Sequence, residues 1–132
     1  MRKGKGRKGE SMEIQNAKIT GTSITMADHG CLTFWVTLEG GSWGCGFGGY
    51  CIGHGAMGYK PKEFTATGSG LVAMMRIMDT VGVHRWEDLE GKYVRCKVSR
   101  SYEGIDEIGN IIENKWFNIR EHFASEKEPT EV

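Results

Sequence analysis

Glycine alternates with larger residues in Trp43–Tyr50, which reads Trp-Gly-Cys-Gly-Phe-Gly-Gly-Tyr, and nine of the twenty glycines lie between Gly40 and Gly58. In an extended strand this period of two places the larger side chains on one face and bare backbone on the other. Glycine weakens a strand, so such a run indicates a bend, a bulge or the close approach of a ligand or second backbone. Two interpretations stay open. One is a bulged strand in an ordinary sheet, and the other is a smooth floor for a flat ligand, with Phe47 or Tyr50 beside it.

The length of 132 residues suits a single folded domain with a core of its own. Residues 1–11 are rich in glycine, lysine and arginine, and we expect a flexible basic arm there. Residues 12–123 are expected to form the domain, and residues 124–132 an acidic, disordered tail. No apolar run approaches the roughly 20 residues that a membrane-spanning helix needs, so we expect no membrane partner.

Four cysteines lie at positions 31, 45, 51 and 96. Their spacing matches neither a Cys-x-x-Cys zinc motif nor the disulfide framework of a small secreted domain. The basic amino terminus lacks the apolar core of a signal peptide. We therefore expect a fold that needs no disulfide, in the reducing cytoplasm.

The charge is balanced overall but unevenly distributed. The first ten residues hold five basic side chains and one acidic one, which leaves twelve basic and sixteen acidic side chains and a net charge of −4 for the rest. A general DNA or RNA binder carries a basic face over its folded surface, so this distribution argues against that class.

Hydrophobic periodicity predicts an α+β fold, with an antiparallel sheet of about five strands packed against one main helix, followed by a short C-terminal helix. The expected strands lie at residues 12–26, 32–38, 43–50, 94–98 and 105–112. The main helix is expected over 71–81, with Gly82 ending it and Thr65, Thr67 or Ser69 capping its start. A short helix is expected over 115–123, and a long glycine-rich loop over 53–70.

Side chains that carry chemistry do not form a recognisable catalytic set. Asp28 and His29 stand at a turn beside Cys31, where neighbouring side chains do not converge on one substrate. Cys45, Cys51 and His54, with His29 or Cys31, have no known zinc-ligand spacing. We therefore expect no catalytic residues, no metal and no cofactor.

Several short strings are spread along the chain: Asn16–Thr20, Asp28-His29-Gly30, Thr33-Phe34 with Leu38-Glu39, Gly46–Tyr50, Trp86–Leu89, Gly91–Arg95, and Ile108-Gly109-Asn110 running to Lys115-Trp116-Phe117. Together they resemble the first type of Thoeris anti-defence proteins, which are phage-encoded sponges. The resemblance covers about residues 12–123, and Gly46–Tyr50 is its most specific part. It implies a nucleotide-binding domain without enzyme activity, which sequesters a cyclic ADP-ribose isomer made by bacterial TIR-domain enzymes.

The resemblance also implies assembly and location. Family members form homo-oligomers, from dimers to hexamers, and some hold cyclic oligonucleotides at a second site. Such a protein acts in the cytoplasm of the infected host cell. Cys51–Gly55, which is neutral and glycine-rich here, departs from the acidic segment that relatives carry after the same tyrosine.

A nucleotide sponge needs an aromatic ring for the base, cations or backbone N–H groups for phosphates, and polar groups for ribose hydroxyls. The candidate ligand-binding residues are Phe47, Tyr50, Thr67, Tyr93, Arg95, Asn118 and Arg120. Arg100 and Arg95 compete with Arg120 for the phosphate role. A small single-stranded nucleic-acid-binding module, stacking bases on Trp35, Phe47 and Tyr93, is the alternative, and a small nucleotide enzyme is a third class.

Overall fold

The computed structural model describes residues 12–55, 63–99 and 104–125. They form one antiparallel sheet of eight strands, two α-helices and a 3-10 turn. The strands are β1 (Met12–Asp28), β2 (Cys31–Glu39), β3 (Gly44–Gly48), β4 (Gly53–His54), β5 (Thr65–Ala66), β6 (Tyr93–Ser99), β7 (Glu107–Asn110) and β8 (Trp116–Asn118). The helical elements are α2 (Gly68–Val81), η1 (Trp86–Leu89) and α3 (Ile119–Ala124). None of the described helices is long and apolar enough to cross a membrane.

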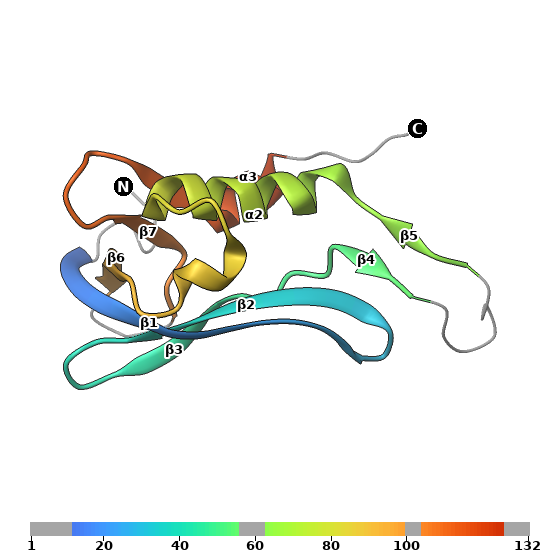
Figure 1. Cartoon of the computed structure of the whole chain (residues 1–132), viewed down its shortest axis with the longest axis horizontal. Coiled ribbons are helices and arrows are strands. Elements are labelled where there is room, and N and C mark those ends of the chain that lie inside the picture. Colours follow the sequence, from blue (N-terminus) through green and yellow to red (C-terminus); the bar gives the residue numbers. More distant parts are fainter. Residues whose placement is uncertain (1–11, 56–62, 100–103, 126–132) are drawn as a thin grey trace, which may run out of the picture.

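Strand β1 changes partner along its length. Its first part, Met12–Lys18, pairs with β6, and the part from Lys18 to Asp28 pairs with β2. A register shift between Ile19 and Gly21 marks a bulge where the partner changes, and a bulge bends a strand. The sheet therefore curls, with the order β5-β4-β2-β1-β6-β7-β8 and β3 paired to the other end of β2 (Figure 1).

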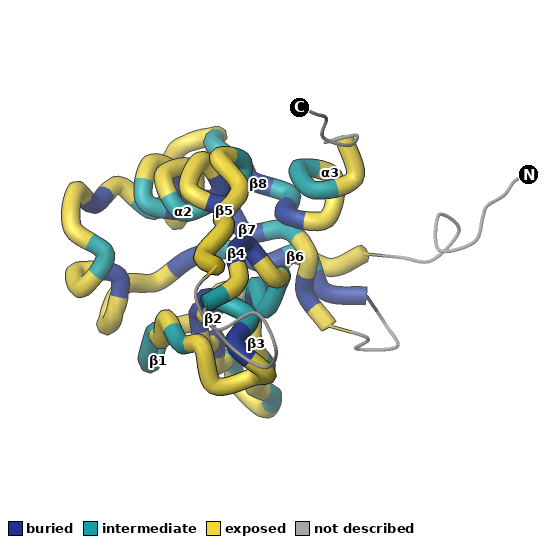
Figure 2. Tube along the Cα trace, turned by 90° about the vertical axis from the view of Figure 1, so that its right-hand side faces the viewer, coloured by how far each residue is buried: buried dark blue, intermediate teal, exposed yellow. Residues whose placement is uncertain are grey.

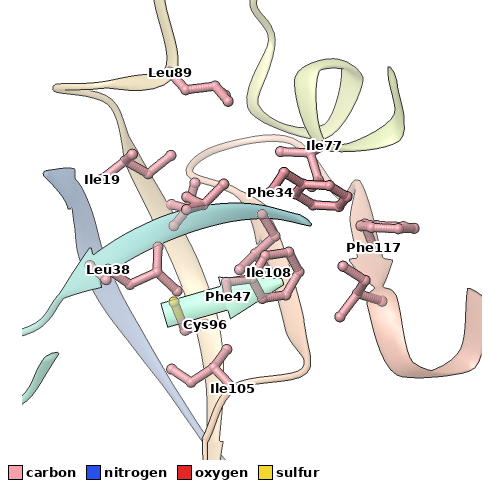
Figure 3. Packing of buried hydrophobic residues seen from close by; sticks show 14 of the residues in the cluster. Ile19, Phe34, Leu38, Phe47, Ile77, Leu89, Cys96, Ile105, Ile108 and Phe117 are labelled. Carbon is pink, nitrogen blue, oxygen red and sulfur yellow. The ribbon is translucent and has the colours of Figure 1, made fainter. Parts of the chain in front are cut away.

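The core lies between the curled sheet and helix α2 (Figures 1 and 2). Figure 3 shows Phe34, Phe47 and Ile108 from the strands close to Ile77 from α2. All four side chains are fully buried. Alternation in β2 turns Phe34, Val36 and Leu38 toward this layer, as the sequence predicts. In α2 the buried face is instead Gly70, Ala73, Ile77 and Thr80, whereas Leu71 and Met75, which lie on the helix's apolar stripe in the sequence, are exposed.

Helix α2 confirms the predicted helix and extends it by one turn at its start. Thr67 caps the helix, because its side-chain hydroxyl accepts a hydrogen bond from the backbone N–H of Gly70. Gly82 ends the helix in the left-handed conformation at φ 96°, with its N–H bonded to the Met78 carbonyl. Thr67 is therefore the capping residue among the three candidates.

The glycine strand β3 is covered by a tryptophan of its own sheet. A Cβ atom at Gly46 would lie 2.6 Å from Cε3 of Trp35, whose indole also crosses Gly49. The glycine face is therefore packed against an indole and is not a bare floor for a ligand. On the opposite face, Phe47 is fully buried and meets Phe117 edge-on, with ring centroids 6.5 Å apart.

The sheet has more strands than the predicted five. Strands β4 and β5 have two residues each and lie within the segment expected to be a loop, because two residues are too few to show a period. Residues 116–118, which the sequence predicts as the start of a helix, form β8 instead. Phe117 of this strand pairs with Ile108 of β7. Helix α3 then begins at Ile119, and its last residue Ala124 lies within the expected tail.

A disulfide joins Cys31 and Cys51, whose Cα atoms are 5.6 Å apart. The expectation of a fold without one was wrong, because it rested on the spacing of the cysteines along the chain. Strand pairing brings them together instead: Cys31 opens β2, and Cys51 precedes β4, which pairs with that part of β2. The basic arm, Lys60-Pro61-Lys62, Arg100 and the end of the acidic tail lie outside the described residues.

We predict that Gly46→Ala lowers the free energy of unfolding by about 1–3 kcal/mol, because the new methyl group displaces the Trp35 indole from the strand. Gly44→Ala is the matched control on the same strand, since a Cβ there meets only ordinary contacts at 3.5 and 3.7 Å. It should be neutral or slightly stabilising. Urea unfolding followed by tryptophan fluorescence measures both. Equal effects of the two variants would show that the indole does not rest on Gly46.

Candidate functional site

A cavity of about 430 Å³ lies where the chain leaving β3 meets the end of β6 and the start of α3. It is lined by Met12, Tyr50, Lys97, Ser99, Gly104, Asp106, Glu107, Asn118, Arg120 and Glu121. These residues come from the start of β1, the chain after β3, the stretch from β6 to β7 and the junction of β8 with α3. A cavity of this volume is within the range of small-molecule sites, roughly 300–1,000 Å³.

Tyr50 supplies the aromatic side chain of the cavity. Its ring stacks on Phe123 of α3, with centroids 4.5 Å apart and planes within 19°. Partial burial raises the pKa of the Tyr50 phenol, the nearby Asp106 carboxylate raises it further, and Arg120 lowers it. The Tyr50 ring is therefore held in place by its stack on Phe123. The pKa of its hydroxyl depends on the charges of both Asp106 and Arg120.

Arg120 lies in the first turn of α3 and reaches toward Asp106, the residue directly before β7. Its Nη1 atom is 3.4 Å from Oδ2 of Asp106, and both side chains are at least half exposed. An exposed ion pair of this kind contributes about 0–1 kcal/mol. The guanidinium can therefore exchange Asp106 for the phosphate of a ligand at small cost.

Asn118 and Lys97 both contact Glu107. The Asn118 amide donates to Oε1 of Glu107 at 3.3 Å, and its own side-chain oxygen accepts the Glu121 N–H as the cap of α3. Lys97 Nζ lies 3.3 Å from Oε2 of Glu107. Glu107 thus connects Lys97 of β6 to Asn118, the residue that caps the start of α3.

The charged lining is mixed. Two cations, Lys97 and Arg120, face three carboxylates, Asp106, Glu107 and Glu121. A ligand that carries only negative charge would have to displace carboxylates from both cations. A ligand with both phosphates and hydroxyl groups fits better, because carboxylates accept hydrogen bonds from sugar hydroxyls.

The structure brings Tyr50, Asn118 and Arg120 together among the seven residues predicted for the site. Phe47 is a correction: its ring is fully buried, so it packs in the core and presents no wall to a ligand. Thr67 is used as the cap of α2 and lies outside the cavity lining.

Tyr93 and Arg95 lie on the same face of β6 as Lys97, but neither is among the residues that line the cavity. Tyr93 is half exposed, with Lys18 Nζ 5.9 Å from its ring centroid. The Arg95 guanidinium stacks over Trp116 at 4.7 Å and donates to the Asn110 carbonyl at 2.7 Å. Arg95 is thus committed to internal contacts, whereas Arg120 faces the cavity.

Sequence reasoning missed Lys97, Asp106 and Glu107. Lys97 carried a usable signal, because alternation along β6 places it on the same face as Arg95. For Asp106 and Glu107 the sequence contains no such signal. A carboxylate near the end of a strand indicates a site only once the cation that faces it is known. The comparisons made with protein-family models, curated proteins and solved structures gave no match. A ligand for the cavity is therefore inferred from its geometry and from the sequence.

We predict that Asp106→Asn lowers the pKa of Tyr50 toward its ordinary value of about 10, and that Arg120→Gln raises it. A raised pKa in the folded state means that the unfolded chain loses the phenol proton first, so stability falls as the pH rises above about 10. Ultraviolet titration of tyrosinate, with Tyr50→Phe as the difference reference, measures the shift. Asp79→Asn, which removes a carboxylate outside the cavity, is the control. A rise on Asp106→Asn would contradict the assigned geometry.

Proposed function

We propose that this protein is a nucleotide sponge, which binds and sequesters a cyclic ADP-ribose type of immune signal without degrading it and so blocks the Thoeris effector. The observation that carries the proposal is the convergence of Tyr50, Asn118 and Arg120 on one cavity from segments about 70 residues apart. The sequence resemblance supplies the ligand class, and the mixed charge of the lining is compatible with it. We further propose that the protein forms homo-oligomers, holds cyclic oligonucleotides at a second site and acts in the cytoplasm of the infected host cell.

Each group of such a ligand has a counterpart in the lining. Tyr50 offers the side of its ring not occupied by Phe123 to the adenine base. Arg120 and Lys97 suit the diphosphate. Asp106 and Glu107 then accept hydrogen bonds from ribose hydroxyls, which gives the excess of carboxylates a function.

Capture without chemistry is favoured by the composition of the cavity. Its described lining contains neither histidine nor cysteine, the side chains that most often act as base and nucleophile. His29 and Asp28 contact each other at 2.8 Å on an exposed turn outside the cavity. An enzyme at this site would have to draw its acid and base from the carboxylates, the lysine and the tyrosine of the lining, namely Asp106, Glu107, Glu121, Lys97 and Tyr50.

We predict that Arg120→Ala and Tyr50→Ala each weaken binding of a cyclic ADP-ribose isomer about 10- to 100-fold by calorimetry. Loss of a charge-assisted hydrogen bond or of a base stack is worth roughly 1–3 kcal/mol. Arg85→Ala is the matched control for the arginine, because Arg85 pairs with Asp88 at η1, outside the cavity. Tyr93→Ala is the control for the tyrosine. Unchanged affinity in Arg120→Ala together with a loss in Arg95→Ala would move the phosphate site to β6.

The single-stranded nucleic-acid module stays as a second candidate because of the face of β6 and β8 that carries Trp116. Arg95 and Lys97 both lie over the Trp116 ring, with Lys97 Nζ 4.8 Å from its centroid, and Lys18 lies over the ring of Tyr93. Alternating cations and rings are typical of platforms for unstacked bases. The same calorimetry distinguishes the two. If an oligonucleotide binds more tightly than the cyclic nucleotide, and Tyr93→Ala but not Tyr50→Ala weakens it, the sponge gives way to this module.

We predict that ligand recovered from the denatured complex is intact and still activates its effector, because the described lining offers neither a histidine base nor a cysteine nucleophile. Chromatography and mass spectrometry of the released nucleotide measure this. Ligand kept in buffer for the same time is the control. A linear or hydrolysed product, formed faster than in buffer and slowed by Asp106→Asn, would return the enzyme class to first place.

A further inference from the structure

Cys31, Cys51 and His54 meet at the opposite end of β2 from the β3 pairing. Their ligand atoms all lie within 4.8 Å of one another. Cys31 is the strand partner of His54, and Cys51 Sγ lies 3.7 Å from His54 Nε2. None of the three lines the nucleotide cavity. Three soft or borderline donors therefore converge outside the site already described.

We propose that the reduced protein binds one Zn²⁺ ion through the thiolates of Cys31 and Cys51 and the imidazole of His54. Two thiolates and an imidazole are a donor set that zinc prefers, with water or an external group completing the tetrahedron. The Cys31–Cys51 disulfide and the zinc site are alternative states of the same two sulfurs. The disulfide state therefore excludes the metal.

The geometry of the cluster agrees with a tetrahedral ion. Zinc bonds of about 2.3 Å to sulfur and 2.0–2.1 Å to nitrogen give a sulfur–nitrogen edge of about 3.6 Å. The separation of Cys51 Sγ and His54 Nε2 is 3.7 Å. The two sulfurs must separate to about 3.8 Å on the same geometry, which requires the disulfide to be reduced.

The exchange between the two states balances chemically. A small dithiol reductant breaks the bond between the two Sγ atoms, supplies two electrons and two protons, and is itself oxidised to a cyclic disulfide. Zinc then binds the two thiols and releases their two protons. An oxidant of the thiol–disulfide class reverses the sequence and releases the ion.

The other cysteines provide an internal contrast. Burial raises the pKa of the Cys96 thiol to about 12 and also raises the pKa of Cys45. Both are therefore held as thiols near neutral pH, and neither belongs to the cluster. Cys51 and His54 are exposed, and Cys31 is partly exposed, so an ion can reach the three ligands without unfolding of the core.

The site has a structural purpose that can be measured. Strands β4 and β5 form a ribbon of two residues each, and a ribbon that short has little stability of its own. An ion held by Cys31, Cys51 and His54 would tie the root of this ribbon to β2, as metals do in small domains. Ion binding should therefore raise the melting temperature of the reduced protein.

The test uses the full chain, reduced with dithiothreitol and freed of it under anaerobic conditions. We predict that it binds one equivalent of Co²⁺ with a thiolate charge-transfer band and tetrahedral d–d bands, and that Zn²⁺ displaces the Co²⁺. Zn²⁺ should raise the melting temperature of this form. The same protein with its disulfide intact should give neither the spectrum nor the shift.

Variants assign the ligands. Cys31→Ser and Cys51→Ser should each weaken Zn²⁺ binding at least about a hundredfold, because loss of a ligand costs more than the roughly 10- to 100-fold cost of an outer-shell change. His54→Ala should weaken it at least about tenfold. Cys45→Ser and His84→Ala, which alter a cysteine and a histidine outside the cluster, are the matched controls. Parent-like Co²⁺ spectra in Cys51→Ser, no binding by the reduced parent, or equal binding by the disulfide form would each overturn the proposal.

Discussion

The bend in β1 is the constraint on which the rest of the structure depends. One strand pairs with β6 up to Lys18 and with β2 from Lys18 onward, and the bulge between Ile19 and Gly21 turns it between the two. Two half-sheets that would each expose an apolar face are thereby folded toward one another. The end of β3 is then brought near α3, although the two are about 70 residues apart along the chain. The cavity is a consequence of this curl, because neither half-sheet contains its lining alone.

Tryptophan side chains lie directly on several glycines of the sheet. Trp35 covers Gly46, and a Cβ atom at Gly109 would lie 2.5 Å from Cε3 of its strand partner Trp116. An indole across a strand restores the packing that glycine lacks. Since Trp116 also receives Arg95 and Lys97, this face of β6 and β8 is organised by the same contact. In the run that first indicates a ligand floor, Gly46 and Gly49 thus lie under the Trp35 indole, whereas Gly48 lies against the Phe34 carbonyl in a left-handed conformation.

Local patterns predicted what depends on local physics. Helix α2 followed from its 3.6-residue period and from Gly82, and β2 followed from alternation. The sequence did not predict β8, because the spacing of apolar residues near Trp116 and Phe117 is also compatible with a helix. The strand forms only because β7 pairs with this segment, and the local sequence carries no signal for that pairing. The same limit applies to the site. The alternation of glycines in β3 does not predict that the Phe47 side chain is buried in the core while the Tyr50 ring stacks on α3. Cys31 and Cys51 likewise meet only through the pairing of β2 with β4.

The two proposed sites share one short segment. Tyr50 stacks on Phe123 of α3, while the next residue, Cys51, is bonded to Cys31 at the start of β2. Consecutive residues are therefore anchored on two different elements, which leaves the backbone between them little freedom. A binding protein without turnover gains affinity mainly from groups that are already in place before the ligand arrives. The anchoring of Cys51, by the disulfide or by a metal ion, and the stack of Tyr50 on Phe123 thus have the same effect. Both reduce the freedom of the Tyr50 ring to move before a ligand binds.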